Sequence, residues 1–427
     1  MAAFSIPQML QNWTTFVQGL PLELEESVRR YGALKRRRKI RSGQALLRLL
    51  LNYALWGSLR TAASVAAGMG LDLSAQALQE RVHKARGWLE ALIRQMGSAL
   101  LERQEVALGP EVRRLKIVDA TVIARPSSPG AEWCLQVTLD PQYFQITHLR
   151  LTDAHTGEAL QPEALGSGDL VLADRGYGRW SSLAVALAAK AFFVIRLPWN
   201  TIRWQHPDGA PFDLAAWLQK LEAAGKAVGE VQVVAADDAH QRPLRLIAGR
   251  LPAEAAEQAR KRVRQQARKK KRKPHPTTLV VAGFCLVVTN LPAQVAPETV
   301  LALYRIRWQI EWWFRRWKSI CKLEDLPAYP AKIAYPVLLA KILLILCLQW
   351  LLPDDAWWEE GEPPALGRLL GIAYAAACHI IFPRQSLIEI LSRPWDFMRH
   401  LRLSKRKRPH QLAQLQALAA QIAALLP

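Results

Sequence analysis

The first 110 residues carry the hydrophobic spacing of α-helices. Apolar residues recur every three to four positions through residues 45–56 and 75–92, and the alternation typical of strands is scarce. Between these segments, Gly68-Met69-Gly70 predicts a tight turn, and Ser74 is placed to cap the helix that follows. The pattern therefore predicts an all-helical unit over residues 1–110.

Two features of this helical unit bear on what it contacts. A helix that opens at residues 58–63, the glycine turn and the helix capped by Ser74 form a candidate helix-turn-helix, although short helix pairs are also common in ordinary bundles. Residues 35–41 hold six Lys or Arg, which is too dense for an ordinary solvated helix face. We expect this run to contact phosphates rather than to read bases.

From residue 115 the hydrophobic period changes from that of helices to that of strands. Three short runs rich in Val, Ile, Leu, Thr and Phe come first, with Pro141-Gln142 between the second and third. Three antiparallel strands followed by a strand-helix-strand unit is the order of a ribonuclease H-like sheet, an α/β architecture. The predicted strands are residues 115–124, 132–139, 143–151, 169–173 and 191–197, and the helix is 181–190.

Residues 199–290 are predicted to form an inserted, β-rich unit. It contains a polar hairpin, a short helix, further strands and a basic helix, in which ten of the fourteen residues 260–273 are Lys or Arg. The predicted division is a helical domain at 1–110, a ribonuclease H-like core at 111–198 and 291–395, this insertion at 199–290, and a basic C-terminal tail and helix at 396–427.

Composition narrows the class of partner. The net charge of +21 and the pI of about 10.1 favour a polyanion, with nucleic acid ahead of an anionic membrane surface. The five widely spaced cysteines, without a C-x-x-C pair, indicate a reducing compartment and argue against zinc. Residues 335–352 are apolar but interrupted by Lys341 and Gln349, which favours a buried core helix over a membrane span. We expect a cytoplasmic protein with no signal peptide and no membrane partner.

Two aspartates lie in or directly after predicted strands, where a sheet can hold their carboxylates in fixed positions. Asp119 lies within an apolar strand and shares its face with Leu115, Ile117 and Ile123, so its carboxylate needs a cation or several donors. Asp174 ends the fourth strand, before a turn with two glycines. Each has a plainer interpretation: a paired structural Asp for the first, and a turn-forming Asp for the second.

Glu311 is the third candidate, because its helix separates two faces. At about 100° per residue, Tyr304, Arg307, Glu311 and Lys318 fall on one polar stripe, whereas the packing face lies on another side. On this stripe, Glu311 can join a metal site while Arg307 and Lys318 hold phosphates. The packing face consists of Ile306, Ile310, Trp313, Trp317 and Ile320.

The spacing Tyr304-x2-Arg307-x3-Glu311-x6-Lys318, with Asp174-Arg175-Gly176-Tyr177 and an early-strand aspartate, resembles the cut-and-paste DDE transposases of insertion-sequence family four. The resemblance covers residues 115–330 and includes a long, mostly β insertion between the second aspartate and the glutamate. It implies that Asp119, Asp174 and Glu311 bind two Mg²⁺ or Mn²⁺ ions.

The same resemblance implies the partners. Tyr304, Arg307 and Lys318 would contact the backbone of the transposon end, and a homodimer would cut two ends together. The remaining candidate DNA contacts are Arg175, Tyr177, Arg268, Lys269, Lys270 and Lys271. The implied reaction is cleavage at the element's ends followed by transfer of the 3′-hydroxyl into target DNA. The alternatives are a nuclease or resolvase of the same fold and a non-catalytic DNA-binding relative.

One departure from the family concerns a DNA hairpin step. Relatives that use a hairpin stack a flipped base on an aromatic residue in the last insertion strand, where this chain has Cys285. Phe284 and Trp204 are the candidate substitutes, although Phe284 is more typical of a core residue. The C-terminal stripe of Leu and Ile at residues 412–425 suits either a docking helix or a dimer contact.

Overall fold

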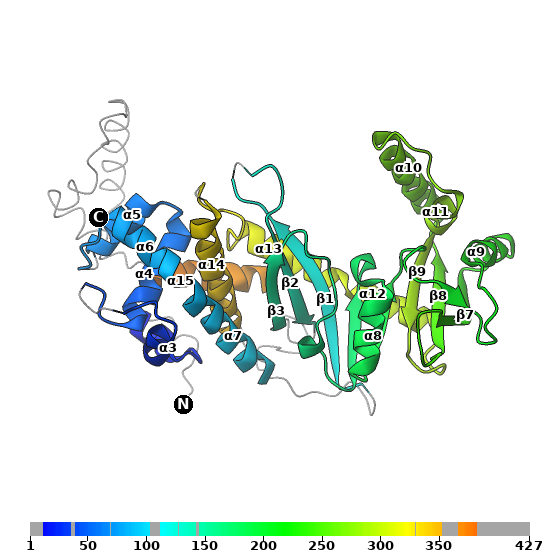
Figure 1. The fold of residues 1–427 in the computed structure, drawn as a ribbon, viewed down its shortest axis with the longest axis horizontal. Helices are drawn as coiled ribbons and strands as arrows, with labels where there is room; N and C mark the ends of the chain where they lie inside the picture. Colours follow the sequence, from blue (N-terminus) through cyan, green and yellow to red (C-terminus); the bar gives the residue numbers. More distant parts are fainter. Residues whose placement is uncertain are drawn as a thin grey trace.

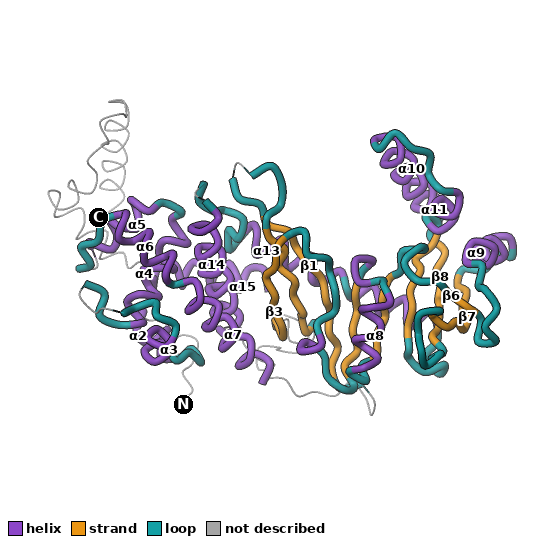
Figure 2. The backbone as a smooth tube through the Cα atoms, viewed as in Figure 1, coloured by secondary structure: helices purple, strands orange, loops and turns teal. Residues whose placement is uncertain are grey.

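The computed structural model describes residues 12–35, 39–68, 70–102, 112–126, 128–141, 145–328, 330–351 and 366–381. One continuous nine-stranded sheet runs through the molecule, in the order β3-β2-β1-β4-β5-β9-β8-β7-β6. Helices gather at the β3 end of this sheet, and α10 and α11 project near the other end (Figures 1 and 2). The fold is therefore mixed α/β, with separate helical and sheet-bearing regions.

The helical region confirms the N-terminal helical pattern. Ser74 caps α6, because its hydroxyl accepts a hydrogen bond from the Ala77 N–H at 3.1 Å. Helices α5 and α6 pack against each other as the predicted helix pair. The basic run is described in part, as residues 36–38 lie outside the described residues. The helices are α2 (Trp13–Gln18), α3 (Leu24–Arg30), α4 (Gly43–Trp56), α5 (Leu59–Gly68), α6 (Ala75–Lys84) and α7 (Arg86–Glu102).

The first five strands have the predicted arrangement. Strands β1 (Arg114–Ile123), β2 (Trp133–Asp140) and β3 (Gln145–Asp153) pair antiparallel. Strand β1 also pairs in parallel with β4 (Asp169–Ala173), which pairs in parallel with β5 (Phe192–Arg196) across α8 (Trp180–Ala188). The carboxyl ends of β1, β4 and β5 therefore lie along one edge of the sheet.

The segment predicted as an insertion is β-rich, but its strands extend the same sheet. Strand β9 (Phe284–Thr289) pairs antiparallel with β5, and β8 (Leu244–Arg250), β7 (Val228–Ala235) and β6 (Trp204–Gln205) follow outward. The sequence did not predict this continuity, because pairing between β5 and β9 joins segments far apart in the chain. The helices of the segment are α9 (Leu214–Ala223), α10 (Ala253–Lys269) and α11 (Pro276–Val281).

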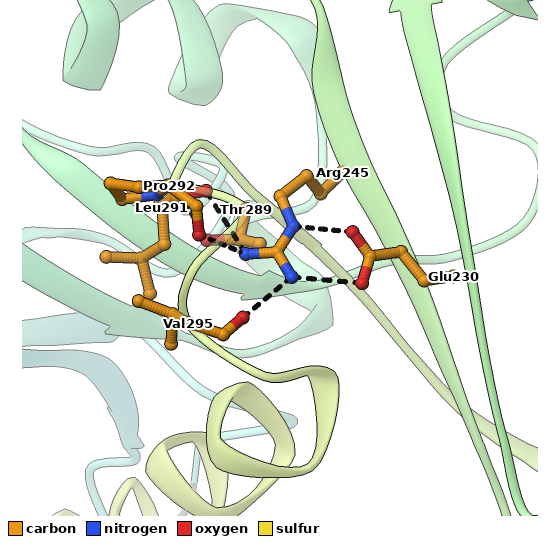
Figure 3. A network of polar contacts seen from close by, with 6 residues as sticks. All are labelled: Glu230, Arg245, Thr289, Leu291, Pro292 and Val295. Atoms are coloured by element: carbon orange, nitrogen blue, oxygen red, sulfur yellow. Dashed lines mark hydrogen bonds and ion pairs between the residues drawn. The ribbon is translucent and has the colours of Figure 1, made fainter.

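A buried arginine ties these outer strands to the loop that leads into the next helix. The Arg245 guanidinium on β8 pairs with both oxygens of Glu230 on β7, at 2.6 and 2.9 Å. It also donates to three backbone carbonyls of the loop after β9 (Figure 3). The loop therefore has a fixed position relative to the sheet. The carbonyls belong to Leu291, Pro292 and Val295.

The predicted helix that carries the stripe from Tyr304 to Lys318 is divided at Arg307. Helix α12 (Pro297–Ile306) ends one residue before Arg307, and α13 (Trp308–Ser319) begins one residue after it. Helix α14 (Ala331–Leu351) then crosses the helical region and packs on α4, α6, α7 and α15 (Leu366–Ile381). It is long and apolar enough to span a membrane, but 83% of its apolar window is buried inside the protein. That burial agrees with the predicted core helix.

Candidate active site

Asp119 lies on the face of β1 that its alternation predicts. Leu115, Ile117 and Ile123, on the same face, belong to the main hydrophobic core. The Asp119 side chain is 12% exposed, and its Oδ1 accepts a hydrogen bond from the Ala120 N–H at 2.8 Å. Burial raises the pKa of Asp119 to about 7, even though the neighbouring Arg307 guanidinium lowers it. The site therefore places a carboxyl group where its charge needs a counter-cation.

Asp174 directly follows β4, the strand that pairs in parallel with β1. The parallel register pairs Val118 with Ala173, so Asp119 and Asp174 follow as adjacent residues at the ends of that register. Asp174 Oδ1 accepts a hydrogen bond from the Gly176 N–H at 2.8 Å, which closes the predicted turn. The charge of Asp174 also contributes to the raised pKa of Asp119, so the structure brings these two carboxylates together.

Glu311 reaches the same place from α13 through a shared cation. Arg307 Nη1 donates to Asp119 Oδ2 at 2.7 Å, and Arg307 Nη2 donates to Glu311 Oε1 at 2.9 Å. The Arg307 side chain is 6% exposed and that of Glu311 is 30% exposed. All three predicted carboxylates therefore lie in one neighbourhood, and a single guanidinium bridges two of them.

Comparison with known proteins identifies the family of this chain. The family model described as "Transposase DDE domain" matches residues 110–330, a span that contains all three carboxylates. The putative transposase InsL of the insertion element IS186A from Escherichia coli K12 is 36% identical over 343 residues, which cover 78% of this chain and 91% of that protein. The chain belongs to the DDE transposase family. It is thus an enzyme of a class that acts on DNA.

Two further proteins are similar. The transposase of IS421 from Escherichia coli is 35% identical over 345 residues, which cover 78% of this chain and 91% of that protein. A solved synaptic complex of the piggyBac transposase with hairpin DNA is 10% identical, with a TM-score of 0.46, and the match covers 100% of this chain and 86% of that one.

This DDE transposase has a fourth acidic group at the site, Glu158, which the sequence patterns did not indicate. Its carboxylate lies against Gly176, at the position that a Cβ atom on residue 176 would occupy. Burial, and next the charge of Asp174, raise the pKa of Glu158, while Arg179 lowers it. Glu158 follows β3 in an irregular segment without helix or strand periodicity, so no pattern marked it.

Basic side chains of the transposase gather beside the carboxylates. Arg175 follows Asp174, and burial lowers its pKa, as does the nearby Arg196 at the end of β5. Burial raises the pKa of Cys285 on β9, and the charges of both arginines lower it. The neighbouring Tyr304 is buried, and its ring lies under Arg307, 5.8 Å from the guanidinium carbon. Arg196 was not predicted, although it ends a parallel strand at the same edge as Asp174.

Other predicted DNA contacts differ in their surroundings. Lys318 is partly buried, donates to the Val122 carbonyl at 3.3 Å and pairs with Glu324 at 2.5 Å. Tyr177 is fully buried beneath the Asp174 turn, and burial raises its pKa. In contrast, the basic end of α10 is exposed to solvent. That exposed group comprises Arg268, Lys269, Lys270 and Lys271.

Neither aromatic candidate for base stacking is accessible to solvent. Phe284 is 2% exposed and Trp204 is 7% exposed, and both belong to the core on the far face of the sheet from Asp119. The core interpretation of Phe284 is therefore correct, and the alternative that Phe284 or Trp204 offers an open stacking face is wrong for this structure.

The donor chemistry of the site fits a hard divalent cation. Asp119, Asp174, Glu311 and Glu158 supply only carboxylate oxygens, the ligands that Mg²⁺ and Mn²⁺ prefer. Two of these carboxylates already enclose one cationic group, Arg307. Within the described residues, no three His, Cys, Asp or Glu side chains are spaced closely enough to hold a metal ion as they stand.

Proposed function

We propose that this DDE transposase cuts DNA at the ends of its own mobile element and joins the resulting 3′-hydroxyl to target DNA, using a ribonuclease H-like core. The observation that carries the proposal is the convergence of Asp119, Asp174 and Glu311, two of which, Asp119 and Glu311, bind one buried cation. The order of β1 to β5 supports the ribonuclease H-like assignment.

The three carboxylates are the proposed metal ligands. When bound, two Mg²⁺ or Mn²⁺ ions supply an activated water or 3′-hydroxyl and stabilise the leaving oxygen. Asp119 lies on β1, and Asp174 directly follows β4, which pairs with β1, so the sheet sets the spacing of the two carboxylates. Glu311 is carried by a helix and is the more exposed of the two carboxylates that Arg307 bridges, which leaves it free to follow the incoming DNA.

The surrounding basic side chains are the proposed DNA contacts. Arg307, once displaced from the carboxylates, and the neighbouring Arg175, Arg196 and Tyr304 can hold phosphates next to the reacting bond. The exposed basic end of α10 projects from the sheet and suits non-specific contact with the backbone (Figure 1). Lys318 can join them if it leaves Glu324.

The wider proposal follows the transposases that this chain resembles. It includes a cut-and-paste route of transposition. The protein would act in the cytoplasm of a prokaryote, in association with the nucleoid. On DNA it would form a homodimer that acts on two inverted-repeat ends. A hairpin intermediate belongs to this route, although the buried Phe284 and Trp204 give it no support.

The test uses two sets of variants with opposite expected defects. Asp174→Asn and Glu311→Gln should abolish Mg²⁺-dependent nicking of a DNA fragment that carries the element's end, because each removes a metal ligand, yet leave DNA binding nearly intact. Alanine substitution of Arg268, Lys269, Lys270 and Lys271 should leave the rate of nicking at saturating protein concentration nearly unchanged. It should also flatten the salt dependence of binding by about one unit of slope for each phosphate that the protein no longer neutralises.

Two outcomes would change the proposal. Nicking that survives Asp119→Asn, Asp174→Asn and Glu311→Gln would mean that the active site lies elsewhere. Cleavage without joining, when pre-cut ends and target DNA are supplied, would leave a nuclease or resolvase of the same fold.

A further inference from the structure

The α12–α13 pair presents a third set of side chains, separate from its packing face and from the stripe that meets the carboxylates. Arg305, Trp308, Trp312 and Arg315 recur at the spacing of one helix face, and all four are exposed. Trp308 is 54% exposed and Trp312 is 57% exposed, and few other large hydrophobic residues in the described part of the chain are exposed. We refer to these four residues as the Arg-Trp stripe.

The two tryptophans of the Arg-Trp stripe do not pack the helix onto the sheet. That role belongs to Trp313 and Trp317, which are each 1% exposed on the opposite side of the same helix. Two large indole rings in solvent carry an unfavourable hydration cost that folding does not relieve. Their exposure is therefore typical of a surface that is covered by a partner.

The charge of the helix indicates what kind of partner covers the Arg-Trp stripe. Glu311 is the only acidic residue between Arg305 and Ser319, a stretch with five Lys or Arg. The Arg307 guanidinium lies 5.7 Å from the Trp308 ring centre, and that of Arg315 lies 5.9 Å from the Trp312 ring centre. Proteins that bind single-stranded nucleic acid combine exposed aromatic rings, on which bases stack, with cations that pair with the phosphates.

We infer that Trp308 and Trp312 stack unpaired bases of a DNA strand, whose backbone Arg305 and Arg315 hold. The stripe takes an unpaired strand and not a duplex, because a duplex already covers the faces of its bases by stacking. Trp312 directly follows Glu311 in the helix, so the stacked strand would run beside the acidic site. The inference rests on the proposed function, since cutting at an element's end is what would supply such a strand.

The test measures binding of a labelled oligothymidine single strand to the full chain by fluorescence anisotropy, with a duplex of the same length as reference. The double variant Trp308→Ala/Trp312→Ala should weaken single-strand binding about thirtyfold, which corresponds to about 2 kcal/mol, and leave duplex binding nearly unchanged. Trp308→Phe/Trp312→Phe should recover most of the affinity because it keeps the aromatic faces, whereas Trp308→Leu/Trp312→Leu should not. Tyr31→Ala, at an aromatic that is 41% exposed in the helical region, is the matched control and should behave as wild type.

Three outcomes would overturn the inference. Equal loss of single-strand and duplex binding would reduce the stripe to a general phosphate contact. Full recovery by the leucine variant would make it a merely apolar surface. Loss of self-association in sedimentation, with single-strand affinity unchanged, would assign it to a contact between protein copies. The proposed function fails separately, if the wild-type chain does not nick DNA or if the carboxylate variants still do.

Discussion

Two buried arginines connect the sheet to the segment that follows β9, and their hydrogen-bonding capacity is satisfied to different extents: Arg245 bonds to the loop before α12, and Arg307 lies between α12 and α13. Arg245 makes five hydrogen bonds, two to the single carboxylate of Glu230 and three to backbone carbonyls. Arg307 makes one hydrogen bond to Asp119 and one to Glu311, and its Nε finds no acceptor among the described residues. Both residues are 5% exposed, so burial alone does not distinguish them.

The difference lies in the balance of charge around each arginine. Arg245 meets one carboxylate and fixed carbonyl dipoles, an arrangement with little left to gain from another ligand. Arg307 meets two carboxylates, and Asp174 and Glu158 add further negative charge to Asp119. One guanidinium cannot neutralise such an excess, and a group of divalent cations can. An arginine whose donors are all paired, such as Arg245, thus indicates a structural role, and an arginine surrounded by an excess of carboxylates, such as Arg307, indicates a binding site.

The largest expected effect comes from breaking the acid-rich network. Arg307→Gln should reduce nicking by about a hundredfold or more, because a positioned charge next to the reacting phosphate is lost. Its effect on unfolding should stay within about 1 kcal/mol, since Asp119, with a pKa already raised to about 7, can take up a proton once its partner is gone. Nicking assays and urea denaturation of the same variant measure the two effects.

A Mn²⁺ titration followed by electron paramagnetic resonance gives an independent reading of Arg307. Without DNA, Arg307→Gln should bind Mn²⁺ at least as tightly as wild type, because the cation that competes for Asp119 and Glu311 has been removed. Weaker Mn²⁺ binding, or a stability loss like that of a structural ion pair, would show that Arg307 and Arg245 belong to one class after all.

The second effect comes from breaking the saturated network. Arg245→Gln should lower the free energy of unfolding by about 3–5 kcal/mol, because it leaves the Glu230 carboxylate and three carbonyls without their donor. Glu230→Gln should cost less, since the guanidinium keeps its carbonyl acceptors. Nicking per folded molecule should be retained in both, and selective loss of nicking without loss of stability would contradict the structural role.

Much of this architecture follows from local patterns, and the rest depends on pairing between distant segments. Strand alternation predicted the face of Asp119, and helical spacing predicted that Glu311 and Arg307 share a stripe. It also assigned Trp313 and Trp317 to packing, from which the exposure of their neighbours could have been predicted. The Arg307 to Asp119 bond spans 188 residues, so no local period encodes it.

The other features that the sequence did not predict also lack a local pattern that encodes them. Glu158 lies in an irregular segment, where the chain has no repeating side-chain direction to interpret. The single sheet arises because β9 returns to pair with β5, and a hydrophobic strand pattern is the same whether its partner is near or far in the chain. The break at Arg307 is likewise invisible, because the residues around it carry no Gly or Pro that would end a helix.

A third buried cation, Lys341 in α14, extends the comparison to a charge with too little compensation. Lys341 is 3% exposed, and burial lowers its pKa to about 8, although the charge of Asp325 raises it. Below pH 8 the folded protein therefore holds a charged lysine in an apolar core. Lys341→Met should raise the free energy of unfolding near pH 7 by about 2 kcal/mol, the smallest of the three effects.

The pH dependence of the Lys341→Met effect tests its cause. The unfolded chain keeps the lysine proton up to about pH 10.4, whereas the folded protein releases it near pH 8. Between these values the unfolded state binds more protons, so the wild type regains stability as pH rises. The advantage of Lys341→Met should therefore shrink from about pH 8 upward, as measured by denaturation at matched pH. Lys332→Met, at an exposed position of the same helix, should show no such trend, and a constant advantage for Lys341→Met would mean that it improves packing and does not relieve a charge.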